Sequence, residues 1–200
     1  MHTENAKISR GQQKITAAVR RFNFDFRGKR ILDIGSSTGG FTEEALKLGA
    51  SKVVAVEKGT NQMRAPLRYD QRICLREKTD IFDVKPAEIG EIDAILADVS
   101  FVSLRKILKK AKEFANGETD FLVMLKPQFE AEQTQLVRGV VKNEKTRREI
   151  VKKFELWLKI NGFLVKKKQD NEIVGRFGNL ERFYWLKIAE NTTKFKKKKN

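Results

Sequence analysis

One stretch of the chain, from Ile31 to Phe41, constrains the fold more than any other part of the sequence. It reads ILDIGSSTGGF, in which an apolar run is followed by a turn at Gly35, by small residues, and by a helical pattern that continues to residue 48. This order predicts a strand, a tight backbone turn and a helix N-terminus. Such a unit is typical of α/β proteins that bind a nucleotide-like ligand at the turn.

The residues around this turn favour one kind of cofactor. Glycine lets bare backbone approach a ligand, but Ser37 stands where the dinucleotide fingerprint has its middle glycine. Asp33, just before the turn, suits the cationic ammonium of a methionine moiety and would repel a pyrophosphate. Glu57 ends the next apolar run, about 20 residues further on, where a ribose diol is usually held. The pattern therefore predicts bound S-adenosylmethionine, against the alternative of an empty structural turn.

Apolar strand patterns alternate with amphipathic helix patterns along most of the chain, which predicts a largely parallel sheet covered on both faces. The strands are expected near 31–34, 52–56, 72–75, 92–98, 121–125, 163–165 and 183–186, and the helices near 10–22, 40–48, 61–69, 103–115 and 144–160. Pro66 is unfavourable inside the third helix and could delay its start. The predicted fold class is α/β, a Rossmann-like class I methyltransferase fold with an antiparallel last strand. We expect one domain over 9–189, a disordered N-terminus over 1–8 and a basic disordered tail over 190–200.

Charge and rare residues narrow the possible functions. The formal net charge is +16, and five lysines lie in the last seven residues, so an anionic partner such as nucleic acid or a membrane surface is expected. With Cys74 as the single cysteine and His2 as the single histidine, an intrachain disulfide and a Cys/His zinc site are excluded. A Ser-His-Asp or Cys-His catalytic group lacks its base unless His2 at the N-terminus supplies it. No apolar run has the length of a membrane span, and no N-terminal segment resembles a secretion signal. These features predict a soluble, cytoplasmic protein.

An acid and a lysine mark the ends of two neighbouring strands. Asp98 follows the fourth apolar run, and Lys126 follows the fifth, where Pro127 ends the strand. Because ligands of open parallel sheets gather beyond the carboxyl ends of the strands, both side chains are candidates for chemistry. Considered singly, either residue could equally be a solvated strand end.

Taken together, the motifs of this chain resemble a known family, the TlyA-type RNA methyltransferases. These proteins are also called hemolysin A and belong to the FtsJ group of ribose 2′-O-methyltransferases. The matching segments span nearly the whole chain, and those that contain Asp98 and Lys126 are the most specific. They are Ser9-Arg10-Gly11 with Lys14, Leu32 to Thr42, Gly59 to Gln62, Asp98 to Phe101 with Ser103-Leu104, Lys126 to Glu130, Gly139-Val140-Val141, and Gly178-Asn179 with Glu181.

The resemblance implies a catalytic tetrad of Lys14, Asp98, Lys126 and Glu181. Lys126 would steer the ribose hydroxyl and could also deprotonate it; the sequence leaves both roles open. Without the resemblance, Lys14 would be read as part of a solvated helix face and Glu181 as a surface acid. The resemblance also implies the cofactor-binding residues. These are Asp33, Gly35, Ser37 and Gly39 at the methionine end, Glu57 at the ribose, and Thr79, Asp80 and Ile81 at the adenine. The cofactor-binding set also includes Ser36, Gly40, Phe41 and Asp98. Asp80 could instead be a turn or capping residue.

The chain departs from the family pattern in two places. TlyA-type proteins usually have a small RNA-binding domain ahead of the methyltransferase fold, and we expect it to be missing here, because the chain begins almost at the helix with Lys14. The basic body and tail would then bind the RNA phosphates. The alternatives are that the sequence is part of a longer protein or that a partner binds the RNA. Arg64-Ala65-Pro66 also differs from the pattern, which puts the local helix in doubt.

The sequence therefore predicts an S-adenosylmethionine-dependent RNA methyltransferase that modifies a ribose, with ribosomal RNA or a ribosomal particle as its partner and without a metal. The alternatives are a non-catalytic basic RNA-binding protein with the same fold, a nicotinamide dehydrogenase, and a membrane-lysing protein, which the absence of a spanning segment disfavours. The modified nucleotide, the ribosomal subunit and the oligomeric state are not contained in the sequence.

Overall fold

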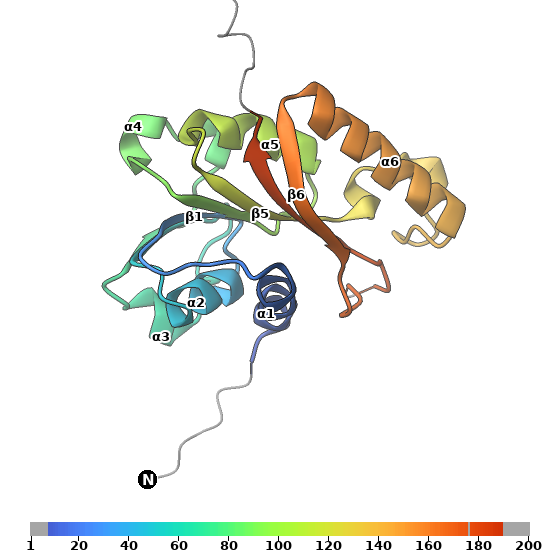
Figure 1. The fold of residues 1–200 in the computed structure, drawn as a ribbon. Coiled ribbons are helices and arrows are strands. Elements are labelled where there is room, and N and C mark those ends of the chain that lie inside the picture. The colour runs from blue at the N-terminus through green and yellow to red at the C-terminus, as the bar shows by residue number, and fades with distance from the viewer. Residues whose placement is uncertain (1–7, 176, 190–200) are drawn as a thin grey trace, which may run out of the picture.

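The computed structural model describes residues 8–175 and 177–189, which form an α/β domain around one sheet (Figure 1). Within these residues the sheet has seven strands in the order β3-β2-β1-β4-β5-β7-β6. All neighbouring strands are parallel except β7, which runs antiparallel to both β5 and β6. The predicted α/β fold, with a mostly parallel sheet and an antiparallel last strand, is confirmed. The strands are β1 Arg30–Ile34, β2 Lys52–Val56, β3 Ile73–Arg76, β4 Ala94–Ala97, β5 Asp120–Leu125, β6 Phe163–Asp170 and β7 Arg182–Ile188.

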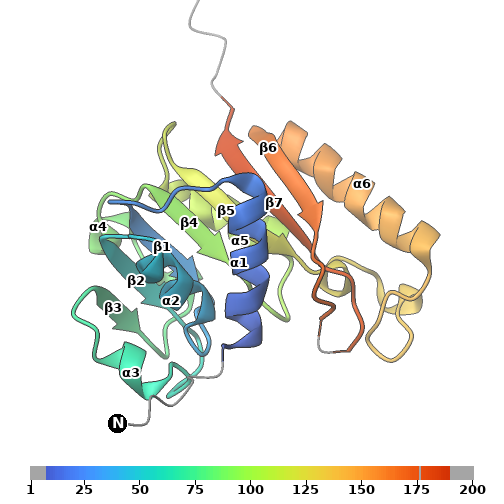
Figure 2. The same cartoon turned by 60° about the horizontal axis from the view of Figure 1, so that its bottom comes forward.

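Helices cover both faces of the sheet (Figures 1 and 2). One layer holds α1 Arg10–Phe22, α2 Gly40–Lys47 and α3 Ala65–Arg68, and the other holds α4 Pro86–Ile89, α5 Leu104–Ala111 and α6 Glu144–Ile160. Four short 3-10 helices also occur, at Ile81–Asp83, Lys112–Phe114, Pro127–Phe129 and Gln133–Gln135. Each helical layer buries its own apolar core against the sheet.

Strand residues alternate strictly between the two cores. In β5, Leu122 and Met124 belong to the core under α1 and α2, whereas Phe121, Val123 and Leu125 belong to the core under α5 and α6. Successive side chains of a strand point to opposite faces, so the next residue after Leu125 is directed toward the α1 layer. This alternation decides on which face the polar residues that follow each strand emerge.

The ends of the two long helices follow from local side chains. At α1, the Ser9 hydroxyl accepts the backbone N–H of Gln12 at 3.1 Å. At α6, the Asn143 side chain accepts the N–H of Thr146 at 3.1 Å, as expected for an N-cap. Both helices match the predicted ranges.

Other boundaries differ from the prediction. The expected helix over 61–69 is a single turn, Ala65–Arg68, because Pro66 fits only in the first turn of a helix. The expected strand 92–98 is shortened to β4, and the helix 103–115 changes to a 3-10 turn after Ala111. Strand β6 runs beyond the predicted 163–165, through a register shift between Val165 and Lys167. Ile8 is described and exposed. The rest of the two predicted disordered segments, 1–7 and 190–200, lies outside the described residues.

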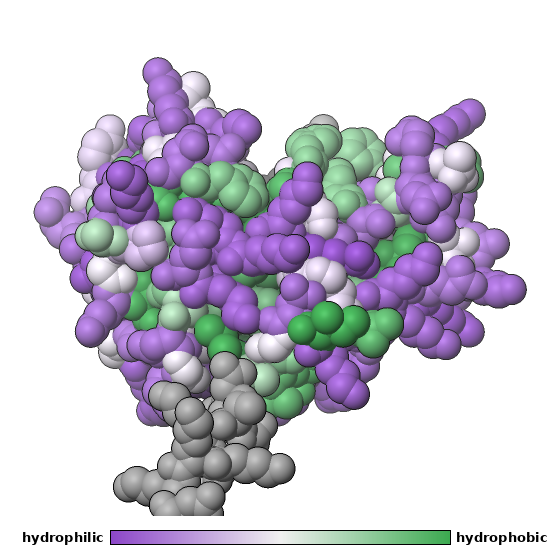
Figure 3. Space-filling view, turned by 90° about the horizontal axis from the view of Figure 1, so that it is seen from above, coloured by the Kyte–Doolittle hydropathy of each residue, from purple (hydrophilic) through white to green (hydrophobic). Residues whose placement is uncertain are grey.

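The outer surface of the α4, α5 and α6 layer is mostly hydrophilic, with small and separate apolar patches (Figure 3). Within residues 8–175 and 177–189, no helix combines the length and the apolar character needed to cross a bilayer.

Candidate functional site

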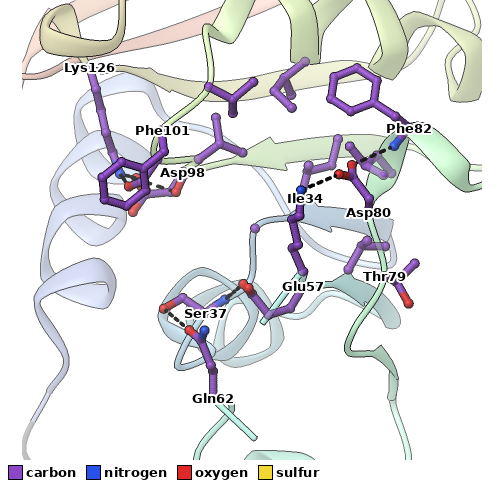
Figure 4. A pocket seen from close by; sticks show the side chains of 18 residues that line it. Ile34, Ser37, Glu57, Gln62, Thr79, Asp80, Phe82, Asp98, Phe101 and Lys126 are labelled. Carbon is purple, nitrogen blue, oxygen red and sulfur yellow. Dashed lines mark hydrogen bonds and ion pairs between the residues drawn. The ribbon is translucent and has the colours of Figure 1, made fainter. Parts of the chain in front are cut away.

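A cavity of about 930 Å³ opens at the carboxyl ends of β1, β2 and β4, where an open parallel sheet binds ligands (Figure 4). Its wall combines backbone of the first turn with apolar side chains such as Ile34 and Val99, and with several charged groups. The predicted site residues on this wall are Gly35, Ser37, Glu57, Thr79, Asp80, Ile81, Asp98 and Lys126.

The turn after β1 is held open by backbone geometry and by Glu57. Gly35 has φ +78°, and a Cβ there would lie 3.2 Å from the Val99 side chain, so a glycine fits best. The Ser37 N–H donates to one carboxylate oxygen of Glu57 at 2.8 Å (Figure 4). The Gly59 N–H donates to the other oxygen at 2.6 Å. Glu57 therefore ties the loops after β1 and β2 together and presents its carboxylate to the cavity.

Part of the predicted cofactor segment packs behind the cavity rather than on its wall. These residues are Ser36, Gly39, Gly40 and Phe41. A Cβ on Gly40 would lie 2.8 Å from the backbone nitrogen of Gln12, so this glycine lets α2 approach α1. The Phe41 ring stacks on Phe183 with 5.9 Å between the ring centroids. Their placement points to helix packing; a direct role at the cofactor stays a prediction.

Asp33 is also set back from the wall, and it is 1 % exposed. The Thr42 hydroxyl donates to its Oδ2 at 2.6 Å, while Oδ1 has no hydrogen-bond partner among the described residues. Burial raises the pKa of Asp33 to about 7, and the nearby charges of Asp98 and Glu57 act in the same direction. A buried carboxyl with one open acceptor fits a neighbouring cation or water, so the predicted role toward an ammonium group stays open.

Asp80 has the capping role that the sequence left open, while its predicted role at the adenine stays a prediction. It caps the 3-10 helix Ile81–Asp83 by accepting the Phe82 N–H at 3.1 Å, and it also lines the cavity (Figure 4). Lys58 lies 3.0 Å from its carboxylate, and this contact together with the backbone hydrogen bond lowers the pKa of Asp80. Asp80 is therefore a charged residue at the edge of the cavity, and its capping hydrogen bond to Phe82 fixes its position.

Lys126 and Asp98 meet at the rim of the cavity. The Lys126 ammonium lies 2.7 Å from an Asp98 carboxylate oxygen and donates to the Ser100 hydroxyl at 2.9 Å (Figure 4). Asp98 and Lys126 each come two residues after a side chain that points into the α1 layer, Leu96 and Met124 respectively. Because side chains alternate along a strand, both are directed toward that layer as well. The predicted pairing of an acid and a lysine from neighbouring strand ends is thus present.

Lys14 and Glu181 form a second, buried pair with 2.5 Å between nitrogen and oxygen. They are 8 % and 3 % exposed, so the alternatives of a solvated helix face and a surface acid are wrong. In the antiparallel ladder Leu125 lies opposite Arg182, which places Lys126 next to Glu181 one step beyond it. The four predicted tetrad residues therefore form two ion pairs at one end of β5 and β7.

Phe101 is a site residue to which the sequence assigned no role. It lines the cavity, its side chain is 92 % exposed, and its backbone has φ +64°, a conformation that bulky residues rarely adopt. Its ring lies 5.3 Å from that of Phe129 between centroids. The segment Asp98 to Phe101 marked the position, but neither its exposure nor its strain can be read from a sequence pattern.

Glu130 connects the two loops that present Asp98 and Lys126. Its carboxylate accepts the Ser103 hydroxyl at 2.9 Å and the Leu104 N–H at 2.7 Å, which joins the loop after β5 to the start of α5. Burial raises its pKa. The loops that present Asp98 and Lys126 are therefore fixed relative to each other.

The site offers lysines and carboxylates for binding and proton handling. No group of three or more His, Cys, Asp or Glu side chains in the described part of the chain is arranged to hold a metal ion. The site thus offers a cavity with acidic and apolar walls, the tetrad lysines Lys14 and Lys126 held by carboxylates, and the exposed ring of Phe101.

Comparison with known proteins identifies the family. The model of the FtsJ-like methyltransferases matches residues 8–187. The 16S/23S rRNA (cytidine-2′-O)-methyltransferase TlyA of Mycobacterium tuberculosis is 35 % identical over 187 residues, which are 92 % of this chain and 70 % of that protein. The 23S rRNA (cytidine-2′-O)-methyltransferase TlyA of Campylobacter jejuni is 35 % identical over 180 residues, which are 89 % of this chain and 70 % of that protein. A solved structure described as a candidate hemolysin of Streptococcus thermophilus superposes with a TM-score of 0.87 at 33 % identity, covering 94 % of this chain and 70 % of that one. The chain belongs to the FtsJ-like methyltransferase family, and within it to the TlyA or hemolysin A type.

Proposed function

We propose that this protein transfers a methyl group from S-adenosylmethionine to the 2′-hydroxyl of a ribose in ribosomal RNA. The observation that supports this most directly is the Lys126–Asp98 pair at the rim of the cavity, with the Lys14–Glu181 pair beside it. The named activities of the TlyA relatives point to the same reaction and substrate. A cytoplasmic location, where ribosomes are found, is part of this proposal.

The cavity fits the proposed cofactor. Its volume of about 930 Å³ suits a nucleoside with an amino acid side chain, and its glycine turn leaves room at the backbone. Glu57 would accept hydrogen bonds from the ribose hydroxyls, and Ile81 and Val99 would pack against the adenine. When bound, S-adenosylmethionine supplies an electrophilic methyl group on a sulfonium.

Lys126 is proposed to orient the attacking hydroxyl. Its ammonium is held by Asp98 and Ser100, which limits the directions in which it can approach the ribose oxygen. In the transfer, Lys126 would hold the 2′-oxygen in line with the methyl group, whose transfer would leave the cofactor as a neutral thioether, and the hydroxyl proton would pass to water or to Lys126 in its neutral form. Glu181, positioned by Lys14, would accept a hydrogen bond from the same ribose.

Phe101 is proposed to contact the base of the modified nucleotide. An exposed ring at the mouth of the cavity offers a stacking surface, and bases in single-stranded RNA commonly stack on aromatic side chains. The strained backbone at Phe101 has no evident structural benefit, because the ring buries little surface. We therefore infer a role of this ring in binding the substrate.

The proposal is tested by methyl transfer to ribosomal RNA and to isolated ribosomal subunits, with S-adenosylmethionine labelled in the methyl group. Nuclease digestion and mass spectrometry should locate the label on a ribose oxygen. Lys126→Ala should abolish transfer and leave cofactor binding by calorimetry nearly unchanged, whereas Lys159→Ala, an exposed lysine on α6, should behave as the wild type. Label on a base, or full activity of Lys126→Ala, would refute the proposal.

A further inference from the structure

A tight hairpin turn lies between β5 and α6. Val137 and Val140 exchange two backbone hydrogen bonds of 2.9 and 3.1 Å, and the two residues between them, Arg138 and Gly139, have φ +52° and +76°. Two successive positive φ values define a type I′ turn, whose first position normally holds Asn, Asp or Gly. Arg138 is therefore an unusual residue for this turn and occupies a strained backbone conformation.

Asn179, in the loop between β6 and β7, connects this loop to the turn by side-chain hydrogen bonds. It is 3 % exposed, its side-chain oxygen accepts the Val141 N–H at 3.1 Å, and its side-chain nitrogen donates to the Gly139 carbonyl at 3.1 Å. Its own carbonyl accepts the Gly175 N–H at 2.9 Å. One buried amide thus holds together two loops that are 40 residues apart in the chain.

The joined loops stand next to the tetrad. Glu181 follows Asn179 by two residues, and a Cβ on Gly175 would lie 2.8 Å from the Glu181 carboxylate. In both ribbon views the segment before α6 and the loop between β6 and β7 leave the same end of the sheet (Figures 1 and 2). The cofactor cavity lies at the carboxyl ends of β1, β2 and β4, whereas these loops lie beside β7 and β6, so they flank the tetrad on the side opposite the cavity.

The joined loops present unpaired positive charge. Arg138, Lys142 and Lys145 are exposed, and none of them forms an ion pair with a described carboxylate. The neighbouring Glu144 is already engaged by Arg147 and Arg148. Unpaired basic side chains next to an active site attract a phosphate backbone.

We propose that segment 137–142, together with Gly175 and residues 177–179 and joined to them by Asn179, forms a lip that binds the phosphate backbone of the RNA substrate beside the Lys14–Glu181 pair. Arg138 and Lys142 contact phosphates, and Asn179 is a positioning residue that keeps the lip in place. This inference rests on the proposed function, since it assumes an RNA substrate. It explains why a strained arginine occupies the turn, because the side chain is needed where its backbone is disfavoured.

The first test separates binding from stability with Arg138→Gly, because glycine adopts the turn without strain. The variant should melt at the same temperature as the wild type or higher, yet bind purified 16S and 23S ribosomal RNA about three- to tenfold more weakly in filter-binding assays at moderate salt. Arg138→Gly/Lys142→Gln should lower the slope of log Kd against log salt by about 1.4 to 1.8. The control is Lys159→Gln/Lys166→Gln, which removes two exposed, unpaired lysines away from the turn.

The second test concerns Asn179. Asn179→Ala should raise the Kd for RNA to about the same extent as Arg138→Gly while the Kd for S-adenosylmethionine stays unchanged, and the double variant should bind RNA only slightly more weakly than either single variant. Additive effects, or an Arg138→Gly variant that binds RNA within twofold of the control, would overturn the inference. Both tests measure the Kd for RNA without cofactor. A failure of methyl transfer by the wild type would therefore refute the proposed function, and the two binding tests could still be interpreted.

Discussion

The buried carboxyl of Asp33 makes a quantitative prediction about stability. In the unfolded chain its pKa lies near the model value of 3.8, whereas in the folded protein burial raises it to about 7. Between these values the folded state binds more protons than the unfolded state, so the contribution of Asp33 to the free energy of unfolding is largest at low pH and falls as the pH rises toward 7. Each pH unit in this window corresponds to about 1.4 kcal/mol.

We expect the substitution Asp33→Asn to remove this dependence. An amide oxygen can still accept the Thr42 hydroxyl, which now lies 2.6 Å from the carboxylate, and an amide does not ionise. Relative to the wild type, Asp33→Asn should gain about 3 kcal/mol of unfolding free energy between pH 5 and pH 8, with little further change above pH 8. For a chain of this size that corresponds to a shift of the urea midpoint by more than about 1 M.

The assay is urea unfolding at several pH values, followed by the fluorescence of Trp157 and Trp185, in the absence of cofactor. Thr42→Ser is a suitable control, because it keeps the hydroxyl donor and the titrating carboxyl and should follow the pH dependence of the wild type. A difference between Asp33→Asn and the wild type that does not change with pH would show that Asp33 is ionised in the folded protein at low pH, and would refute the reasoning.

Three further predictions follow from contacts described above. Lys14→Met leaves the buried Glu181 carboxylate unpaired and should lower the free energy of unfolding in urea by about 3 to 5 kcal/mol. The double variant Lys14→Met/Glu181→Gln should regain most of the stability but no activity. A loss below about 1 kcal/mol in the single variant would contradict a buried pair. Gly40→Ala places a Cβ 2.8 Å from the Gln12 nitrogen and should destabilise by about 1 to 3 kcal/mol in thermal unfolding; no loss would mean that α1 and α2 are not in close contact. Phe101→Ala should lower kcat/KM for RNA about five- to hundredfold with unchanged cofactor affinity, and weakened cofactor binding would argue against base stacking.

Much of the fold could be predicted from the sequence because its signals are local. Glycine and apolar runs located the first strand, turn and helix, and the N-cap Asn143 located the start of α6. The single turn at Ala65–Arg68 was hard to predict, because the apolar spacing of a helix is present there but Pro66 limits where the helix can begin. The extra length of β6 depends on pairing with β7, which is a tertiary contact.

The candidate site could be predicted only in part. Asp98 and Lys126 were marked by their positions at strand ends, whereas Lys14 and Glu181 came from the family resemblance alone. Their pairing requires that α1 packs on the face toward which β5 and β7 point those residues. The burial of Asp33 depends on Thr42 in α2, and the exposure of Phe101 depends on a backbone torsion, so neither follows from residue type or spacing.

The separation of the two apolar cores has a consequence for how such a protein can change over time. The tetrad, the carboxyl of Asp33 and the close approach of α1 and α2 all lie on one side of the sheet. Residues of α6 that fill the other core, such as Phe154 and Leu158, do not line the cavity and can therefore be exchanged for others of similar volume at little risk to the reaction. Divergence among relatives should accumulate under α6 first, which makes this part of the core the better place for engineered stabilisation.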